Sequence, residues 1–138
     1  MIGRMKTLEA TAKTSATPAA VWALLSDGPA WADWGAWSES TVEGGGELAP
    51  GKVRMLYARP FRVRERITEM VPQERMAYEM LDGMRIEGYS SQITLEPADG
   101  GTLVRWRSQW EKGNPVHATV LRLAIRDACR RVAKAAAR

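Results

Sequence analysis

Apolar and polar residues alternate along most of the chain between residues 38 and 111. In residues 61–71, Phe61, Val63 and Ile67 fall on one face of an extended chain, and Arg62 and Arg64 fall on the other. A period of two predicts a strand with one buried and one exposed face, and such alternation is typical of antiparallel sheets. The same pattern predicts seven strands in total, at residues 8–14, 38–43, 52–59, 61–71, 74–81, 85–96 and 102–111.

Helical signals stand between the first two strands and at the end of the chain. Thr17 followed by Pro18 predicts a helix N-cap with proline in the first turn, and a second short helix is expected to carry Trp31 and Trp34. From about residue 115 to 138, apolar residues share one face and basic residues spaced four apart share another. This pattern predicts a long amphipathic helix that must bury its apolar side.

The composition is that of one globular domain spanning residues 1–138. Of the 138 residues, 45% are hydrophobic and 26% are charged, which is enough apolar surface for one sizeable core. No apolar run approaches the ~20 residues of a membrane span, and no apolar signal segment follows the N-terminus. The single cysteine, Cys129, excludes an intrachain disulfide and fits a reducing compartment. We therefore expect a cytoplasmic protein.

No metal or cofactor is expected. The single histidine, His117, excludes a multi-histidine metal site. Residues 46–52 match the first seven positions of a phosphate-binding loop, but Val53 stands where a hydroxyl residue would hold magnesium. That segment also leads into a predicted strand instead of a helix, so a loop between strands explains it.

The net charge of +4 is concentrated at the end of the chain. Residues 112–138 contain seven lysines or arginines and one acid, Asp127. These basic residues could meet phosphate, a membrane surface or an acidic partner, but few large apolar residues lie beside them, so a solvated outer face is the simpler interpretation. Nucleic acid is not the expected partner. Arginine-rich sheet faces also occur at dimer contacts, so a homodimer that uses the outer face of the sheet is a further possibility. The arginines expected on that face are Arg54, Arg62, Arg64, Arg66, Arg75, Arg105 and Arg107.

The order of these elements resembles the helix-grip fold of the SRPBCC superfamily, which includes START domains, the birch-pollen-allergen family and the polyketide cyclase/dehydrase family. Residues 16–27 look like the first-helix signature of that superfamily, and residues 88–97 with 101–106 look like its closing hairpin. The polyketide cyclase/dehydrase branch is the most similar. The resemblance implies an α+β fold, in which a curved seven-stranded antiparallel sheet wraps around the C-terminal helix and encloses an apolar cavity.

If the resemblance holds, the inward rows of the strands and helix would line that cavity. Aromatic walls, flexible methionines and a few hydroxyl groups suit a small, flat, largely apolar ligand. The alternative is that the same residues fill a solid core. The expected ligand-binding residues are Met55, Tyr57, Met76, Tyr78, Met80, Tyr89, Ser91, Trp106, Ser108 and Trp110 from the sheet, and Leu121 and Ile125 from the helix.

Glu65 is the candidate catalytic residue. It shares strand parity with Val63 and Ile67, so a regular strand points it inward. A low-dielectric cavity disfavours the charged form of a carboxyl group and raises its pKa, which suits a general acid or base. A β-bulge that turns Glu65 outward, or a salt bridge near the end of the sheet, would remove that role.

Three functions remain open from the sequence. The first is binding of a small hydrophobic or aromatic molecule in the cavity. The second is catalysis by a cyclase or dehydratase on a polyketide-like substrate, with acid–base chemistry at Glu65. The third is an interaction module that uses the basic C-terminal helix.

Overall fold

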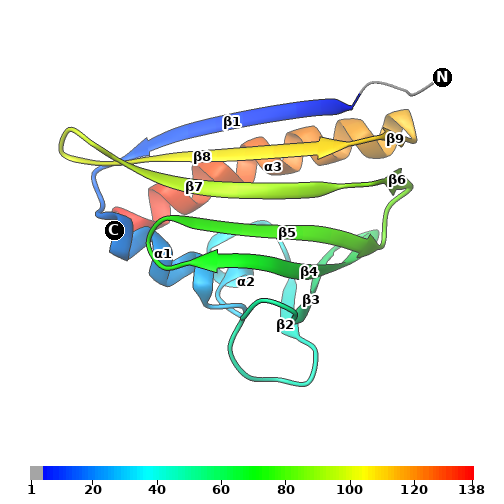
Figure 1. Ribbon diagram of the computed structural model, residues 1–138, viewed down its shortest axis with the longest axis horizontal. Helices are drawn as coiled ribbons and strands as arrows, with labels where there is room; N and C mark the ends of the chain where they lie inside the picture. Colours follow the sequence, from blue (N-terminus) through cyan, green and yellow to red (C-terminus); the bar gives the residue numbers. More distant parts are fainter. Residues whose placement is uncertain (1–4) are drawn as a thin grey trace.

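A seven-stranded antiparallel sheet forms one layer of the protein, and the long C-terminal helix lies along one face of it (Figure 1). The computed structural model describes residues 5–138. The strand order is β1-β8-β7-β5-β4-β3-β2, so β1 and β2 form the two edges. The strands of this sheet are β1 (Lys6–Thr14), β2 (Glu39–Val42), β3 (Val53–Ala58), β4 (Phe61–Val71), β5 (Arg75–Asp82), β7 (Ser90–Ala98) and β8 (Gly101–Trp110).

The three helices are α1 (Pro18–Ser26), α2 (Trp31–Trp34) and α3 (Pro115–Ala136). The predicted cap of α1 is confirmed, because the Thr17 hydroxyl accepts a hydrogen bond from the Ala20 N–H at 3.2 Å. Asn114 caps α3 in the same way, with its side-chain oxygen accepting from the N–H groups of Val116 and His117. Two short helices follow the first strand, and the long helix α3 ends the chain against the seven-stranded sheet. This order confirms the predicted helix-grip arrangement.

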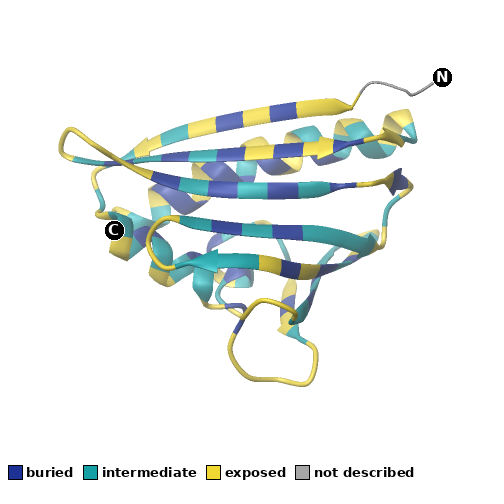
Figure 2. Ribbon diagram, in the orientation of Figure 1, coloured by how far each residue is buried: buried dark blue, intermediate teal, exposed yellow. Residues whose placement is uncertain are grey.

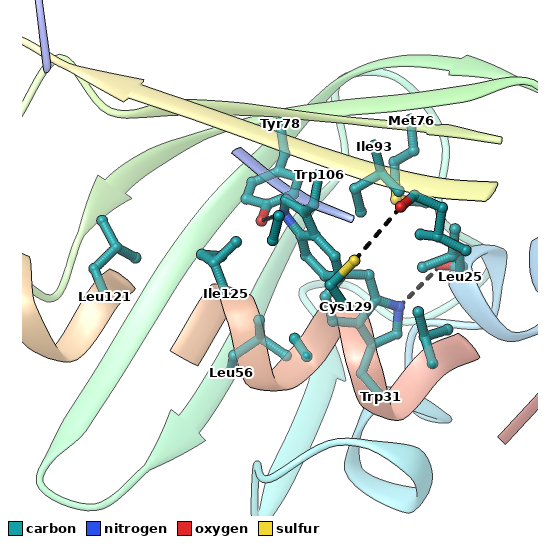
Figure 3. Close-up of a cluster of buried hydrophobic side chains, with 14 of the residues drawn as sticks. Leu25, Trp31, Leu56, Met76, Tyr78, Ile93, Trp106, Leu121, Ile125 and Cys129 are labelled. Carbon is teal, nitrogen blue, oxygen red and sulfur yellow. Dashed lines mark hydrogen bonds between the residues drawn. The ribbon is translucent and has the colours of Figure 1, made fainter. Parts of the chain in front are cut away.

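The core lies between the sheet and α3, and buried residues alternate with more exposed ones along most strands (Figure 2). Trp31 and Trp106 are both 0% exposed, and their ring centroids lie 5.7 Å apart in an edge-to-face arrangement. Trp31 donates its indole N–H to the Leu25 carbonyl at 2.9 Å, which fixes α2 against α1 (Figure 3). Large aromatic side chains of this kind contribute most of the apolar area that holds such a core together.

The predicted strand at residues 85–96 is in fact interrupted. β6 (Ile86–Glu87) leaves the main sheet and pairs with β9 (Lys112–Gly113). Gly88 follows with a φ of +69°, a conformation that favours glycine, and the chain then enters β7. The predicted inward face of this segment is nevertheless correct from Tyr89 onward, since Tyr89 and Ser91 are buried.

The predicted inward face of residues 52–59 is wrong. In β3, Arg54 and Leu56 are buried, whereas Met55 and Tyr57 are only half-buried. Tyr57 lies opposite Arg62 of β4, and the Arg62 guanidinium stacks over its ring at 5.5 Å on the outer face of the sheet. The two faces of this strand are similarly apolar apart from Arg54. A prediction from hydrophobicity therefore places the face with Arg54 outside, although that face is the buried one.

The outer face of the sheet carries acidic residues among its arginines. Arg64 forms ion pairs with Glu43 and Asp82, while Arg66 pairs with Glu79. Similar pairs join Arg75 to Glu69, Arg105 to Glu9 and Glu96, and Arg107 to Glu9. The row that the sequence predicts as basic is therefore largely neutralised, and Arg54 is not part of it.

Within residues 5–138, no helix is long and apolar enough to cross a membrane.

Candidate ligand cavity

A cavity of about 80 Å³ lies between α3 and the β3–β4–β5 part of the sheet. Its walls are formed by apolar side chains, two tyrosines and one carboxylate. On the helix side it reaches the exposed residue Ala124, which places an opening at the surface of α3. The lining residues are Trp37, Leu56, Ala58, Phe61, Val63, Glu65, Tyr78, Met80, Met84, Tyr89, Val120, Leu121, Ala124 and Ile125.

The cavity is smaller than the ~300–1,000 Å³ that is usual for ligand pockets. Side chains therefore occupy most of the space between the sheet and the helix in this conformation. Met80 and Met84 both line the cavity and are only half-buried. Methionine side chains adjust their shape at low cost, so these two residues are the parts of the wall that can move to admit a larger molecule.

Glu65 points into this cavity and forms an ion pair with Arg54. The two residues lie directly opposite each other in β4 and β3, so they share the inward face. The Nε of Arg54 donates to Oε1 of Glu65 at 3.1 Å, and Nη2 lies 3.0 Å from the same oxygen. Arg54 is 0% exposed and Glu65 is 4% exposed, so this is a buried pair of opposite charges. The bulge between Arg64 and Glu65 does not turn Glu65 outward.

Two aromatic rings contact the Arg54 guanidinium. Its central carbon lies 3.7 Å from the ring centroid of Trp31 and 4.6 Å from that of Tyr78. Stacking of this kind suits the planar, delocalised charge of arginine. The pair still leaves polar atoms unused, because neither Nη1 nor Nη2 of Arg54 makes a hydrogen bond within residues 5–138. Oε2 of Glu65 makes none with these residues either.

The protonation of the lining groups is set by burial. Burial raises the pKa of Glu65 above its ordinary value, and the neighbouring Arg54 charge partly opposes that rise. Burial also raises the pKa of Tyr89 to about 12 and that of Tyr78 well above its ordinary value. Both tyrosines are therefore neutral hydroxyl groups at physiological pH, and Glu65 is the one carboxyl group among the lining residues.

A hydrogen-bond network behind the cavity wall uses the predicted hydroxyl residues. The indole N–H of Trp106 lies 3.1 Å from the Tyr78 hydroxyl and 2.9 Å from Oγ of Ser91. Oγ of Ser108 lies 2.9 Å from Oγ of Ser91 and 3.2 Å from the Tyr89 hydroxyl. These contacts fix the two tyrosine rings in the wall, and they leave the serines inside the core instead of at the cavity surface.

The structure brings about half of the predicted site residues together. Glu65, Tyr78, Met80, Tyr89, Leu121 and Ile125 line the cavity. Met76, Ser91, Trp106, Ser108 and Trp110 are buried but do not line it, and Met55 and Tyr57 lie on the outer face. The prediction missed Leu56 and Ala58 because it chose the wrong face of β3. Trp37 and Met84 lie outside the strands, where periodicity carries no signal.

His117 and Cys129 lie outside the cavity lining. Nδ1 of His117 accepts a hydrogen bond from the Arg85 N–H at 2.9 Å, and the imidazole packs edge-to-face on Phe61 at 5.0 Å. Cys129 is 1% exposed, and burial raises its pKa to about 12. Within residues 5–138, no group of three or more histidine, cysteine, aspartate or glutamate side chains is placed to hold a metal ion.

The gripped helix and the cavity beneath it define a helix-grip protein of the SRPBCC superfamily. The chain belongs to the family described as "Polyketide cyclase / dehydrase and lipid transport", which matches residues 5–138. No curated protein sequence matches the chain.

Solved structures share the fold at low sequence identity. A protein from Thermobifida fusca is 26% identical with a TM-score of 0.74, over 95% of this chain and 89% of that chain. A protein from Nitrosospira multiformis is 20% identical with a TM-score of 0.78, over 94% of each chain. Ara h 8.0201 is 15% identical with a TM-score of 0.76, over 96% of this chain and 98% of that chain.

Proposed function

We propose that this protein binds a small hydrophobic or aromatic molecule in the cavity between the sheet and α3. The observation that carries the proposal is an apolar, aromatic-walled cavity at this position that reaches the surface of α3 at Ala124. Family membership supports the same conclusion, since the family description includes lipid transport. Ligand sites of proteins are typically apolar hollows with a small number of placed polar groups.

The details of the wall favour a binding site over a simple packing defect. A well-packed core excludes voids because lost contacts are costly, and it avoids charged groups. Here the void contains the carboxylate of Glu65, and a buried arginine is positioned to hold it. Maintaining a buried ion pair contributes little to stability compared with apolar residues of similar size. A function in the cavity gives a reason for this arrangement.

Ligand binding requires a change in the wall. The ligand would displace the side chains of Met80 and Met84 and occupy the space next to Tyr78 and Tyr89. Strands β4 and β5 and helix α3 would keep their positions, because their buried residues belong to the rigid core. Binding by small adjustments of side chains is the usual behaviour of preorganised sites.

A catalytic role is the second candidate, and Glu65 is the observation that favours it. Oε2 of Glu65 has no hydrogen bond within residues 5–138, and burial raises the pKa of this carboxyl group. A carboxylate of raised pKa can accept a proton from a bound polyketide-like molecule and return it at another position. In that case, Glu65→Gln would abolish turnover while the protein still binds the substrate.

A thermal-unfolding screen tests the binding function. Aromatic polyketides, fatty acids, sterols and planar phenols would each be added at increasing concentration. A ligand at one hundred times its dissociation constant stabilises by about 2.7 kcal/mol, which is a shift of about 5–10 °C for a domain of this size. We expect a saturable shift with at least one apolar class.

Two variants of α3 provide the matched control for this screen. Ala124→Phe places a ring at the exposed edge of the cavity and should abolish the shift. Leu123→Phe adds a ring at the neighbouring position, which is 61% exposed and does not line the cavity, and should leave the shift unchanged. A folded protein that shows no shift with any class, or a shift that Ala124→Phe does not alter, would contradict the proposal.

A further inference from the structure

The polar atoms of the cavity wall differ in whether they already have a hydrogen-bond partner. The hydroxyl of Tyr78 accepts from Trp106, and that of Tyr89 pairs with Ser108. Glu65 is the one charged side chain among the lining residues, all of which lie in the described part of the chain. One of its oxygens is held by Arg54, whereas Oε2 has no partner within residues 5–138. The wall therefore presents a hydrogen-bond acceptor to whatever enters.

Arg54 determines that this acceptor is a charged one. A guanidinium group stays protonated at every physiological pH, and Arg54 is 0% exposed. Protonation of Glu65 would leave that buried positive charge without a counter-charge, which is costly. Arg54 therefore acts as a positioning residue that favours the ionised form of Glu65 and fixes the direction of its carboxylate.

We propose that the ligand of this cavity carries a hydroxyl group, phenolic or alcoholic, that donates a hydrogen bond to Oε2 of Glu65, and that the cavity selects against apolar carboxylates. This inference rests on the proposed binding function and specifies the ligand class. A ligand carboxylate would face the Glu65 carboxylate in an apolar environment, and like charges repel strongly there. A ligand ammonium would find a site that is already neutral, because Arg54 balances Glu65.

The test is a matched series of small molecules that differ only in the polar group. Three apolar bodies are used, namely one aromatic ring with a methyl group, two fused aromatic rings, and a ten-carbon chain. Each is prepared as the alcohol or phenol, the methyl ether, the carboxylate and the amine. Affinities for the wild-type protein are measured by calorimetry at neutral pH.

The hydroxyl compound should bind roughly 10- to 100-fold more tightly than its methyl ether, because a hydrogen bond to a charged group contributes that much. Its affinity should also be at least tenfold higher than that of the carboxylate and of the amine with the same apolar body. Glu65→Gln should reduce the preference for hydroxyl over ether to about threefold or less. Glu69→Gln should retain the preference, because Glu69 lies on the same strand and pairs with Arg75 outside the cavity.

A wrong ligand class and a wrong binding function would give different results. If the ether or the carboxylate binds as tightly as the hydroxyl compound, the proposed ligand class is wrong while the binding function stands. If no member of any series binds, the binding function itself is wrong. Should Glu65→Gln fail to fold, the preference measured in the wild-type protein still decides between hydroxyl, ether, carboxylate and amine.

Discussion

Arg54 of β3 and Glu65 of β4 lie directly opposite each other and form an ion pair on the inward face of the sheet, with Nε and Oε1 3.1 Å apart. Most arginines of the sheet lie on the outer face, where they pair with exposed acids. Arg54 instead is buried in the core, where its guanidinium contacts the rings of Trp31 and Tyr78. The pair places one carboxylate in an otherwise apolar wall, and the proposed chemistry of the cavity depends on this carboxylate.

Removal of one partner should destabilise the protein more than removal of both. Arg54→Met leaves Glu65 buried without its counter-charge, so we expect the free energy of unfolding to fall by about 3–5 kcal/mol. The double variant Arg54→Met, Glu65→Leu has no buried charge and should recover most of that loss. Urea unfolding of the wild type and the two variants measures both values. A double variant that is less stable than Arg54→Met alone would show that the pair stabilises the fold.

Glu65 should make stability fall as the pH rises. Since burial raises its pKa above 4.5, the folded protein holds the Glu65 proton to a higher pH than the unfolded chain does. The stabilisation is fully present below pH 4.5 and is lost as the pH rises through the pKa of the folded state. Glu65→Gln removes this dependence, so the wild type should lose stability relative to this variant as the pH rises above 4.5.

Glu69 on the same strand provides a control of opposite sign. The Arg75 hydrogen bond lowers the pKa of Glu69, so its stabilisation is present above the unfolded pKa and is lost as the pH falls. Relative to Glu69→Gln, the wild type should therefore gain stability as the pH rises, and by a small amount because this pair is exposed. The same sign of pH dependence for both variants would contradict the assignment of Glu65.

The faces of most strands could be predicted from the sequence, but that of β3 could not be predicted from hydrophobicity. Phe61–Val71 contains one apolar set and one charged set, so only one face can be buried. In Val53–Ala58, the face with Met55 and Tyr57 is as apolar as the face with Leu56. Arg54 lies on the same face as Leu56, so hydrophobicity predicts that this face is exposed, although it is buried. An inward Glu65 needs a partner of opposite charge, and this requirement was the available signal.

The cavity itself depends on features that periodicity does not encode. Trp37 and Met84 reach it from segments between strands, and the interruption at Gly88 determines where β7 begins. The volume depends on the side-chain conformations of large residues such as Trp106 and Trp110, which fill the core and not the cavity. The inward positions of Tyr78 and Tyr89 follow from alternation, whereas the size of the space between them and α3 does not.

Cys129 should be nearly unreactive in the folded protein. Its side chain is 1% exposed, Sγ lies 3.7 Å from the Val104 carbonyl, and burial raises the pKa of the thiol to about 12. Since the thiolate is the reactive form, labelling by a thiol reagent at pH 8 should be roughly a thousandfold slower than in the unfolded chain. The comparison in buffer and in denaturant measures this ratio. Rates within tenfold of each other would show that Cys129 is accessible.

His117 should protect one backbone amide near the start of α3. Its Nδ1 accepts from the Arg85 N–H, while its ring packs on Phe61. His117→Phe keeps an aromatic ring but loses the acceptor, so hydrogen exchange at the Arg85 amide should accelerate roughly tenfold. The Glu111 amide donates to the Glu87 carbonyl in the same region and should exchange as before. Unchanged exchange at Arg85 would mean that the imidazole is not its acceptor in solution.

The most direct test of the cavity is an NMR titration that follows the methionine methyl groups. Met80 and Met84 line the cavity, whereas Met55 lies on the outer face and Met70 does not line the cavity. On addition of the tightest ligand from the thermal screen, the Met80 and Met84 signals should shift in a saturable way while those of Met55 and Met70 stay in place. Saturable shifts confined to Met55 or Met70, with Met80 and Met84 unchanged, would place the ligand elsewhere and contradict the account.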